Sequence, residues 1–292
     1  MASLNRTISS REWFILGILI CAAILSFVAL GTQAESDGLL RVYFLNVGQG
    51  DAIFIQAPSG NQVLIDGGPD TKVIQELAEV MPFGDRTIDM LILTHPDADH
   101  INGLIEVLER YDVAMVLENF LERHDSAGYN KWNELKAEAE VVPAVAGQVI
   151  NIDEELYLVI LYPVAGAGRQ SKTNNNSIVA KLVYGENELL LTGDIEAKVE
   201  RELVARGVDV DADLLKVAHH GSKTSTTKEF LDAVTPEAAF IQLGADNRYG
   251  HPHPTVMQRL EERGIKYYRT DTDGRTTLFL NGSDYKVISS EK

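Results

Sequence analysis

The stretch LTHPDADHINGL, Leu93–Leu104, brings imidazoles and carboxylates together directly after the apolar run IDMLILT. His95, Asp97, Asp99 and His100 form an H-x-D-x-D-H cluster at the end of a predicted strand. Such side chains are ligands of Zn²⁺, Mn²⁺ and Fe²⁺, and their number exceeds what one tetrahedral ion usually takes from one segment. The cluster therefore predicts a site for two metal ions. The alternative is a polar loop in which Asp99 or His100 caps the following helix.

Three other apolar runs end in the same residue types. VLIDGG places Asp66 after a predicted strand, LLLTGD places Asp194, and LLKVAHHGS places His219 and His220. An aspartate or histidine at one such position is more often a turn former or a helix cap than a metal ligand. Four such endings in one chain are hard to explain in that way, and together they strengthen the prediction of a metal site.

The composition limits the classes of function. Hydrophobic side chains make up 45% of the 292 residues, enough for one large domain or two smaller ones. Lys and Arg number 26 against 43 Asp and Glu, which gives a net charge of −17. Because a surface of this charge repels polyanions, a general-purpose nucleic-acid binder is disfavoured.

The N-terminal residues 1–34 have the pattern of an export segment. Arg6 and Arg11 precede the uncharged apolar run at residues 13–31, and small residues follow at Thr32–Ala34. Its length suits both a cleaved signal peptide and an uncleaved membrane anchor, and a buried core helix is the third reading. Each export reading places the remainder outside the cytoplasm. The only cysteine, Cys21, lies inside this segment, so the exported part has no thiol ligand.

Strand-like runs alternate with helical periodicity over residues 39–290, with no linker between them. This pattern predicts one α+β domain in which two sheets pack face to face with helices outside. Helical periodicity predicts helices at Lys72–Val80, Ile101–Arg110, Lys131–Glu140, Ala197–Arg206, Thr227–Val234 and Thr255–Arg263.

Seven motifs together resemble those of a known family. NVGQGDA, IDGG, THPDADHINGL, NNNSIVAKL, LLLTGD, LKVAHHGS and NRYGHPHP look like the metallo-β-lactamase fold superfamily of dinuclear metal hydrolases. The resemblance is closest to the β-lactamase-like domain of ComEC/Rec2-type DNA-uptake competence proteins, and it runs from about Arg41 to Gly282. It implies a four-layer αββα sandwich. The polytopic membrane channel that accompanies this domain in the competence proteins has no counterpart in these residues, so DNA transport does not carry over.

The resemblance also implies a role for each candidate ligand. One ion is expected on Asp99 and His100 with a histidine of the 219/220 pair, the other on His95 and Asp97, and Asp194 is expected to bridge them. Carboxylates and amides that orient ligands are expected at Asp66 and Asn176. Because His219 and His220 are adjacent, one should ligate and the other should face the substrate. We expect His219 to ligate.

Two departures from the lactamase pattern bear on the choice of metal. Asp97 stands where lactamases have histidine, and the segment that usually supplies another histidine reads NNNS, Asn174–Ser177. Exchanging imidazole for carboxylate and amide makes a site harder, which favours Mn²⁺ or Fe²⁺ without excluding Zn²⁺. The expected cofactors are therefore two divalent ions drawn from Zn²⁺, Mn²⁺ and Fe²⁺.

The expected function is a phosphodiesterase or nuclease that uses a metal-activated water, with a phosphodiester substrate for which DNA is one candidate. Catalytic roles are expected for Asp99, His220 and His251. NVGQGDA lacks the third glycine of a dinucleotide loop, so no nucleotide cofactor is expected, and its Asp51 is a candidate for the pocket wall. The alternatives are hydrolysis of a lactone, β-lactam or phosphocholine ester, and a non-catalytic binding module. No motif identifies a protein partner.

Overall fold

The computed structural model describes residue 13 and residues 16–19, 37–119, 126–166 and 170–290. The chain divides into two units, Met1–Asp37 and Gly38–Lys292. Apart from Trp13 and residues 16–19, which are helical, the predicted export segment lies outside the described residues. Within the described ranges, no helix has both the length and the apolar composition needed to span a bilayer.

The first sheet of the second unit has eight strands. Their bounds are β1 Leu40–Phe44, β2 Ile53–Gln56, β3 Gln62–Ile65, β4 Thr87–Leu93, β5 Asp112–Glu118, β6 Glu140–Pro143, β14 Thr276–Leu280 and β15 Tyr285–Ser289. The strand order is β15-β14-β1-β2-β3-β4-β5-β6. Strands β3 to β6 pair in parallel and the other neighbours pair antiparallel.

The second sheet has seven strands. Their bounds are β7 Val149–Asn151, β8 Leu156–Tyr162, β9 Val179–Tyr184, β10 Asn187–Leu191, β11 Leu214–Lys216, β12 Ala238–Ile241 and β13 Lys266–Arg269. The strand order is β13-β12-β11-β10-β9-β8-β7, with β10 to β13 parallel. Each sheet therefore has a parallel half, and the carboxyl ends of parallel strands lie at one edge.

The two sheets pack face to face on a shared apolar core. In β1, Leu40, Val42 and Phe44 are buried while the residues between them are partly exposed, which is the alternation of a strand with one face on a core. The Phe44 ring stacks on Phe240 of β12 with centroids 4.2 Å apart, so one aromatic contact joins the two sheets.

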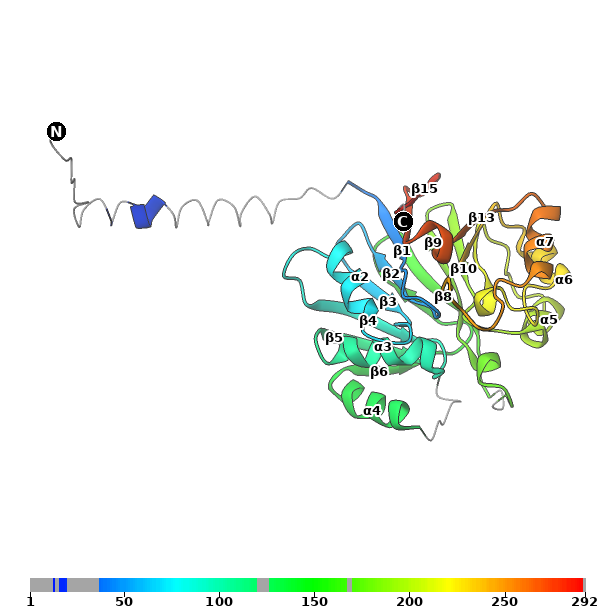
Figure 1. Cartoon of the computed structure of the whole chain (residues 1–292), viewed down its shortest axis with the longest axis horizontal. Coiled ribbons are helices and arrows are strands. Elements are labelled where there is room, and N and C mark those ends of the chain that lie inside the picture. Colours follow the sequence, from blue (N-terminus) through cyan, green and yellow to red (C-terminus); the bar gives the residue numbers. More distant parts are fainter. Residues whose placement is uncertain (1–12, 14–15, 20–36, 120–125, 167–169, 291–292) are drawn as a thin grey trace. The chain divides into compact units, whose positions relative to one another are not determined.

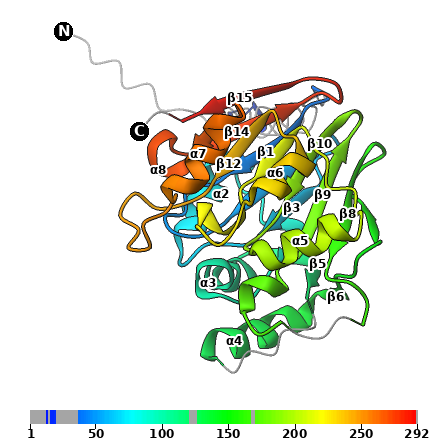
Figure 2. The ribbon, with the colours of Figure 1, turned by 90° about the vertical axis from the view of Figure 1, so that its right-hand side faces the viewer.

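Helices cover the outer face of each sheet (Figures 1 and 2). On the first sheet they are α2 Lys72–Val80, α3 Ala98–Leu108 and α4 Ala127–Leu135, and on the second they are α5 Ala197–Ala205, α6 Lys228–Val234 and α7 Pro254–Glu262. Shorter helical turns are η1 Lys136–Glu138, η2 Thr173–Asn176, η3 Ala218–Gly221 and α8 Thr270–Asp273. The layer order is helix, sheet, sheet, helix, and the predicted αββα sandwich is confirmed.

The helix predicted at Ile101–Arg110 is α3, which begins three residues earlier at Ala98 and so includes Asp99 and His100. The helix predicted at Lys131–Glu140 departs most from the structure. The periodicity predicted a helix over Lys131–Glu140, but α4 ends at Leu135 and Glu140 begins strand β6. The reason lies in β5, because the buried carboxylate of Glu118 accepts hydrogen bonds from Trp132 Nε1, at 2.7 Å, and from Lys136 Nζ. These bonds hold the end of the helical segment beside β5, and the chain then pairs with β5 in parallel.

Candidate metal centre

The predicted ligands follow strands that pair in parallel, so they meet at one edge of each sheet. Asp66 follows β3 and His95 lies just beyond β4, its parallel neighbour. On the second sheet, Asp194 follows β10, while His219 and His220 follow β11, which pairs with it in parallel. Each motif stands at the end of an apolar strand, which is how the sequence reveals it. The same placement at strand ends brings the side chains to one shared site.

Two glycines allow the end of β3 to approach the start of α3. A Cβ atom on Gly103 would lie 1.8 Å from the carbonyl oxygen of Gly67, which no side chain could tolerate. The backbones are joined there, since Gly67 N donates to His100 O at 2.8 Å and Gly103 N donates to Gly68 O at 3.0 Å. This contact places Asp66 beside His100.

Several buried polar atoms of the site lie close together without hydrogen bonds. Within the described part of the chain, Nε2 of three histidines and Oδ1 of one aspartate have no hydrogen-bond partner: His95, His100, His220 and Asp194. His100 Nε2 lies 3.3 Å from Asp194 Oδ2, and His220 Nε2 lies 3.4 Å from the same oxygen. His220 Nε2 also lies 3.4 Å from Asp99 Oδ2. Unpaired buried polar atoms are costly, and divalent ions would satisfy these, so the residues present fit a metal centre.

The other nitrogen of each of these imidazoles is already held. His100 Nδ1 lies 2.8 Å from Asp66 Oδ2, and His220 Nδ1 lies 2.8 Å from the carbonyl oxygen of Gln242. His95 Nδ1 is 3.1 Å from Thr94 Oγ1. Such contacts set the tautomer and the ring orientation and leave Nε2 as the free ligand atom. The expectation that Asp66 orients a ligand agrees with this geometry.

Charge in this cluster shifts several pKa values. Burial alone would lower the pKa of His220, but Asp194 and Asp51 raise it to about 10. The pKa of His100 is also raised well above its usual value, because Asp194 and Asp66 outweigh its burial. Burial would raise the pKa of Asp194, yet His220 and His100 hold it well below its usual range. A divalent ion would therefore displace protons from these imidazoles.

The structure places His220, rather than His219, in the candidate metal-binding group. Both have left-handed backbones, with φ 51° at His219 and 53° at His220, and their rings are 67° apart. We expected His219 to be the ligand, but the group that could hold an ion together with Asp99 and His100 contains His220. His219 is partly exposed, and its Nε2 lies 3.3 Å from Asn174 Nδ2.

The segment that replaces the missing histidine has a local role. Asn176 Oδ1 accepts from Gln170 N at 2.8 Å and Asn176 Nδ2 donates to Lys172 O at 3.2 Å, so this side chain holds its own loop. The expectation that Asn176 orients a ligand stays a prediction, and in this segment Ser177 Oγ lies 3.2 Å from His95 Nδ1. Asp97 is the N-cap residue of α3, and its Oδ2 lies 3.6 Å from His95 Nε2.

Lys216 was not among the predicted site residues. It is 1% exposed and its ammonium pairs with Asp51, which is 2% exposed and lies 3.2 Å from His220 Nδ1. Lys216 Nζ is also 3.9 Å from Asp194 Oδ1, so a fixed positive charge lies beneath the ligands. A lysine at the end of the apolar strand LLK is the signal that could have revealed it, since lysine is almost never fully buried without a partner.

A cavity of about 170 Å³ opens over these ligands, lined by Gln49, Asp97, Asp99, Asn174, Asp194, His219, His220, Tyr249 and His251. Gln49 and Tyr249 were not among the predicted site residues. His251 lies in this wall as expected, whereas His253 is the N-cap residue of α7 and its Nδ1 accepts from Thr255 N at 3.3 Å.

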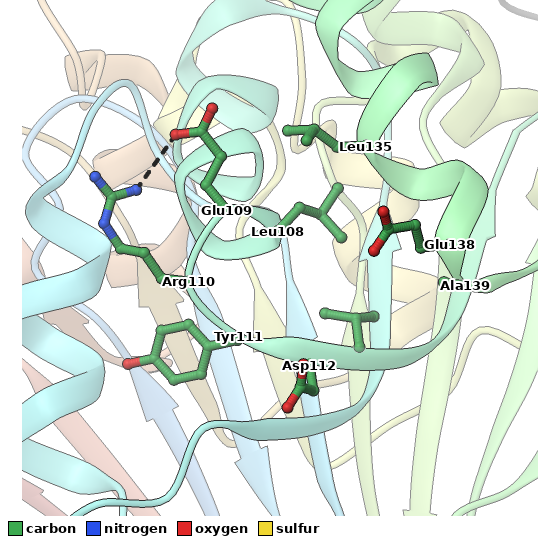
Figure 3. A pocket seen from close by; sticks show the side chains of 9 residues that line it. Leu108, Glu109, Arg110, Tyr111, Asp112, Leu135, Glu138 and Ala139 are labelled. Atoms are coloured by element: carbon green, nitrogen blue, oxygen red, sulfur yellow. Dashed lines mark ion pairs between the residues drawn. The ribbon is translucent and has the colours of Figure 1, made fainter.

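A larger pocket lies where β5 begins (Figure 3). Because β4 and β5 pair in parallel, this is the opposite end of β5 from the edge where His95 follows β4. Its volume is about 420 Å³, and it is bounded by the end of α3, the start of β5 and the segment after α4. Arg110, on its wall, forms ion pairs with Glu106 at 2.7 Å and with Glu109 at 3.6 Å. Its described lining contains no histidine and no unpartnered buried polar atom, so we assign it no chemistry.

The αββα sandwich and its cluster of imidazoles and carboxylates define a class of α+β proteins with a candidate metal centre, and comparison with known families identifies that class. The model for the family described as "Metallo-beta-lactamase superfamily" matches residues 45–244. The chain belongs to this superfamily, and the resemblance inferred from the motifs is confirmed.

Curated relatives narrow the relationship to competence proteins. The chain is 34% identical to ComE operon protein 3 of Bacillus subtilis, over 87% of this chain and 34% of that protein. It is also 34% identical to Recombination protein 2 of Haemophilus influenzae, over 89% of this chain and 31% of that protein. The chain thus spans about a third of the length of these relatives. A solved structure, CmlA, a diiron β-hydroxylase from Streptomyces venezuelae, shares the fold with a TM-score of 0.54 and 16% identity, over 82% of this chain and 54% of that one.

Proposed function

We propose that this chain is an exported, dinuclear metal-dependent phosphodiesterase or nuclease. The observation that carries the proposal is the convergence of three unpartnered imidazole nitrogens and two carboxylates under a narrow cavity. When bound there, divalent ions supply Lewis acidity and a nucleophile from water at neutral pH. Export, by a cleaved signal peptide or by an anchor at residues 13–31, is part of the same proposal.

Six side chains would hold the two ions: His95, Asp97, Asp99, His100, Asp194 and His220. His95 and Asp97 would hold one ion, Asp194 would be shared, and the remaining three would hold the other. The expected ligand set is kept except that His220 replaces His219. The site of His95 and Asp97 is rich in oxygen, which favours Mn²⁺ or Fe²⁺ over Zn²⁺ there.

The residues of the cavity wall suit an anionic substrate. Burial, together with the neighbouring His220 and His219, lowers the pKa of His251 to about 4. Burial also lowers the pKa of His219, despite the nearby Asp194. Both imidazoles are therefore neutral at pH 7, and each can donate one N–H to a phosphate oxygen or accept one proton. Asn174 adds an amide at the same wall.

The size and the charge of the protein limit the substrate. The cavity of about 170 Å³ is small, and the net charge of −17 disfavours long contact with a polyanion. A small phosphodiester or the end of a DNA strand suits both observations. β-Lactams suit the site less well, because Asp97 and the NNNS segment stand where lactamases have histidines.

The test is hydrolysis of bis-p-nitrophenyl phosphate, single-stranded DNA and nitrocefin by the full chain, stripped of metal and then supplied with Mn²⁺ or Zn²⁺. We expect metal-dependent cleavage of the phosphodiesters and negligible cleavage of nitrocefin. Efficient nitrocefin hydrolysis would assign a lactamase, and metal binding without any turnover would assign a binding module.

Two variants of proposed ligands test whether the reaction takes place at this site. Asp99→Ala and Asp194→Ala should lose bound metal and at least about 100-fold in phosphodiester turnover. Asp112→Ala is the matched control, an exposed aspartate in the pocket of Figure 3, and should keep both. If both ligand variants retain wild-type metal content, the metal is bound elsewhere.

A further inference from the structure

Tyr249 is an exposed aromatic side chain in the wall of the metal cavity. It is 65% exposed, and its ring stacks on the imidazole of His251, with centroids 5.8 Å apart and an interplanar angle of 18°. Exposed aromatic residues are common singly and need no explanation by themselves. Among the large exposed hydrophobic side chains of the described residues, Tyr249 is the one that lines this cavity.

The loop that carries Tyr249 is held on both sides. Asn247 Nδ2 donates to Gly244 O and to His251 O, each at 2.8 Å, and Asn247 Oδ1 accepts from His251 N at 3.0 Å. Farther along, His253 N donates to Gly221 O at 2.8 Å, next to the proposed ligand His220. The stacked pair is therefore attached to the backbone of the metal site and presented in a fixed place.

Two polar atoms near this pair have no partner. Gln49 Nε2 and His251 Nδ1 are buried and make no hydrogen bond within the described ranges. Gln49 lines the same cavity, and its Oε1 accepts weakly from Gly244 N at 3.4 Å, which orients the amide. Leaving a buried amide donor unpaired is unfavourable, so Gln49 Nε2 is accounted for if a bound molecule supplies an acceptor.

We propose that Tyr249 and His251 form a stacking platform for a nucleobase, with Gln49 Nε2 donating to a phosphate or sugar oxygen of the same nucleotide. This proposal rests on the proposed phosphodiesterase function and names its substrate as a nucleotide-containing diester. A flat, exposed aromatic face beside a phosphate-binding site suits a base of any identity, because every base has a π face. One platform and a small cavity suit a single nucleotide at a strand end.

Binding to the Mn²⁺-loaded full chain tests the platform without relying on turnover. Adenosine 5′-monophosphate should bind more tightly than ribose 5-phosphate, and Tyr249→Ala should remove that difference by an affinity loss of about 5- to 150-fold, the range of base stacking. Tyr249→Phe keeps the ring and should bind like the wild type. Phe83→Ala, at an exposed aromatic position outside this cavity, is the control. Gln49→Ala should weaken both ligands equally.

Kinetics with a dinucleotide and its analogue lacking one base test the same residue in catalysis. Tyr249→Ala should raise KM for the dinucleotide at unchanged kcat and unchanged metal content, and should leave the abasic analogue unaffected. Equal losses on both substrates, or equal binding of the two monophosphates by the wild type, would overturn the platform. If no phosphodiester is cleaved, the proposed function fails, but the monophosphate binding difference still decides the platform.

Discussion

The floor and the mouth of the metal cavity are built in opposite ways. The floor is the buried layer behind the candidate ligands, which does not itself line the cavity. It consists of Asp51, Asp66 and Lys216, each at most 2% exposed and each fixed by an ion pair or hydrogen bond to a neighbour. The mouth consists of Asp97, Tyr249 and His251, which are partly or largely exposed. Among the described residues, the stacking on His251 is the only aromatic contact of the Tyr249 ring.

Because of this difference in burial, we expect substitutions in the two regions to have different effects. Buried charges are tolerable only when paired, so the floor residues depend on one another and on the ligands above them. A change there should alter stability and metal binding. Mouth residues are solvated, so a change there should cost little stability and should alter which metal or substrate is preferred. Four predictions test this division.

The largest effect is expected from Lys216→Met. The substitution removes the ammonium from Asp51 and leaves the His220 imidazole as its one remaining ion-pair partner among the described residues, which should lower the free energy of unfolding of the metal-free chain by about 3–5 kcal/mol. Urea denaturation measures it. The double variant Lys216→Met with Asp51→Asn removes both charges and should recover part of the loss. A single variant as stable as the wild type would show that the buried pair is not what stabilises the floor.

The pH dependence of metal affinity should be the next largest effect. His220 has its pKa raised to about 10 in the metal-free chain, so the stability from its protonated form is present below about pH 6.5 and is lost as pH rises through about 10. Metal must displace that proton, so affinity should rise up to about tenfold per pH unit for each proton released. Titration of Zn²⁺ at pH 6, 7 and 8 in two buffers measures this slope. A flat profile would contradict protonated ligands in the metal-free site.

Asp66→Asn tests the floor residue that orients His100. The amide keeps the shape but loses the charge that holds His100 Nδ1–H, so metal affinity should fall by about 10- to 100-fold. Competition with a coloured chelator gives the affinity. His253→Asn is a suitable control, because it changes a helix cap outside the ligand cluster. If Asp66→Asn binds metal with unchanged affinity, the carboxylate of Asp66 does not orient a metal ligand.

Asp97→His, at the mouth, should have the smallest effect and change preference more than total activity. Restoring imidazole makes the site softer, so the ratio of Mn²⁺-supported to Zn²⁺-supported phosphodiester turnover should fall several-fold. The wild type should be more active with Mn²⁺, compared at matched free-metal concentrations. The same rank order of metals in both proteins would mean that this aspartate does not set the metal.

Local pattern predicted most of the secondary structure, because periodicity depends on neighbours in the chain. The helix predicted at Lys72–Val80 is α2 with the same bounds, and the prediction of Thr255–Arg263 differs from α7 by one residue at each end. The prediction failed at Lys131–Glu140, where Trp132 and Lys136 bind a carboxylate on another strand. These hydrogen bonds join residues 14 and 18 positions apart in the chain, and such contacts leave no signal in the hydrophobic periodicity of the sequence.

The sequence by itself determined the family, the layered fold and the region of the metal site, because ligands placed at the ends of apolar strands form motifs that can be read locally. Only the tertiary structure places His220, and not His219, in the candidate metal-binding group with Asp99 and His100, since left-handed backbones at both residues turn the rings apart. The pairing of Lys216 with Asp51 was likewise decided in three dimensions. Whether a side chain is buried, and which way it points, depends on packing between segments that are distant in the chain. Both are therefore set when the two sheets pack together.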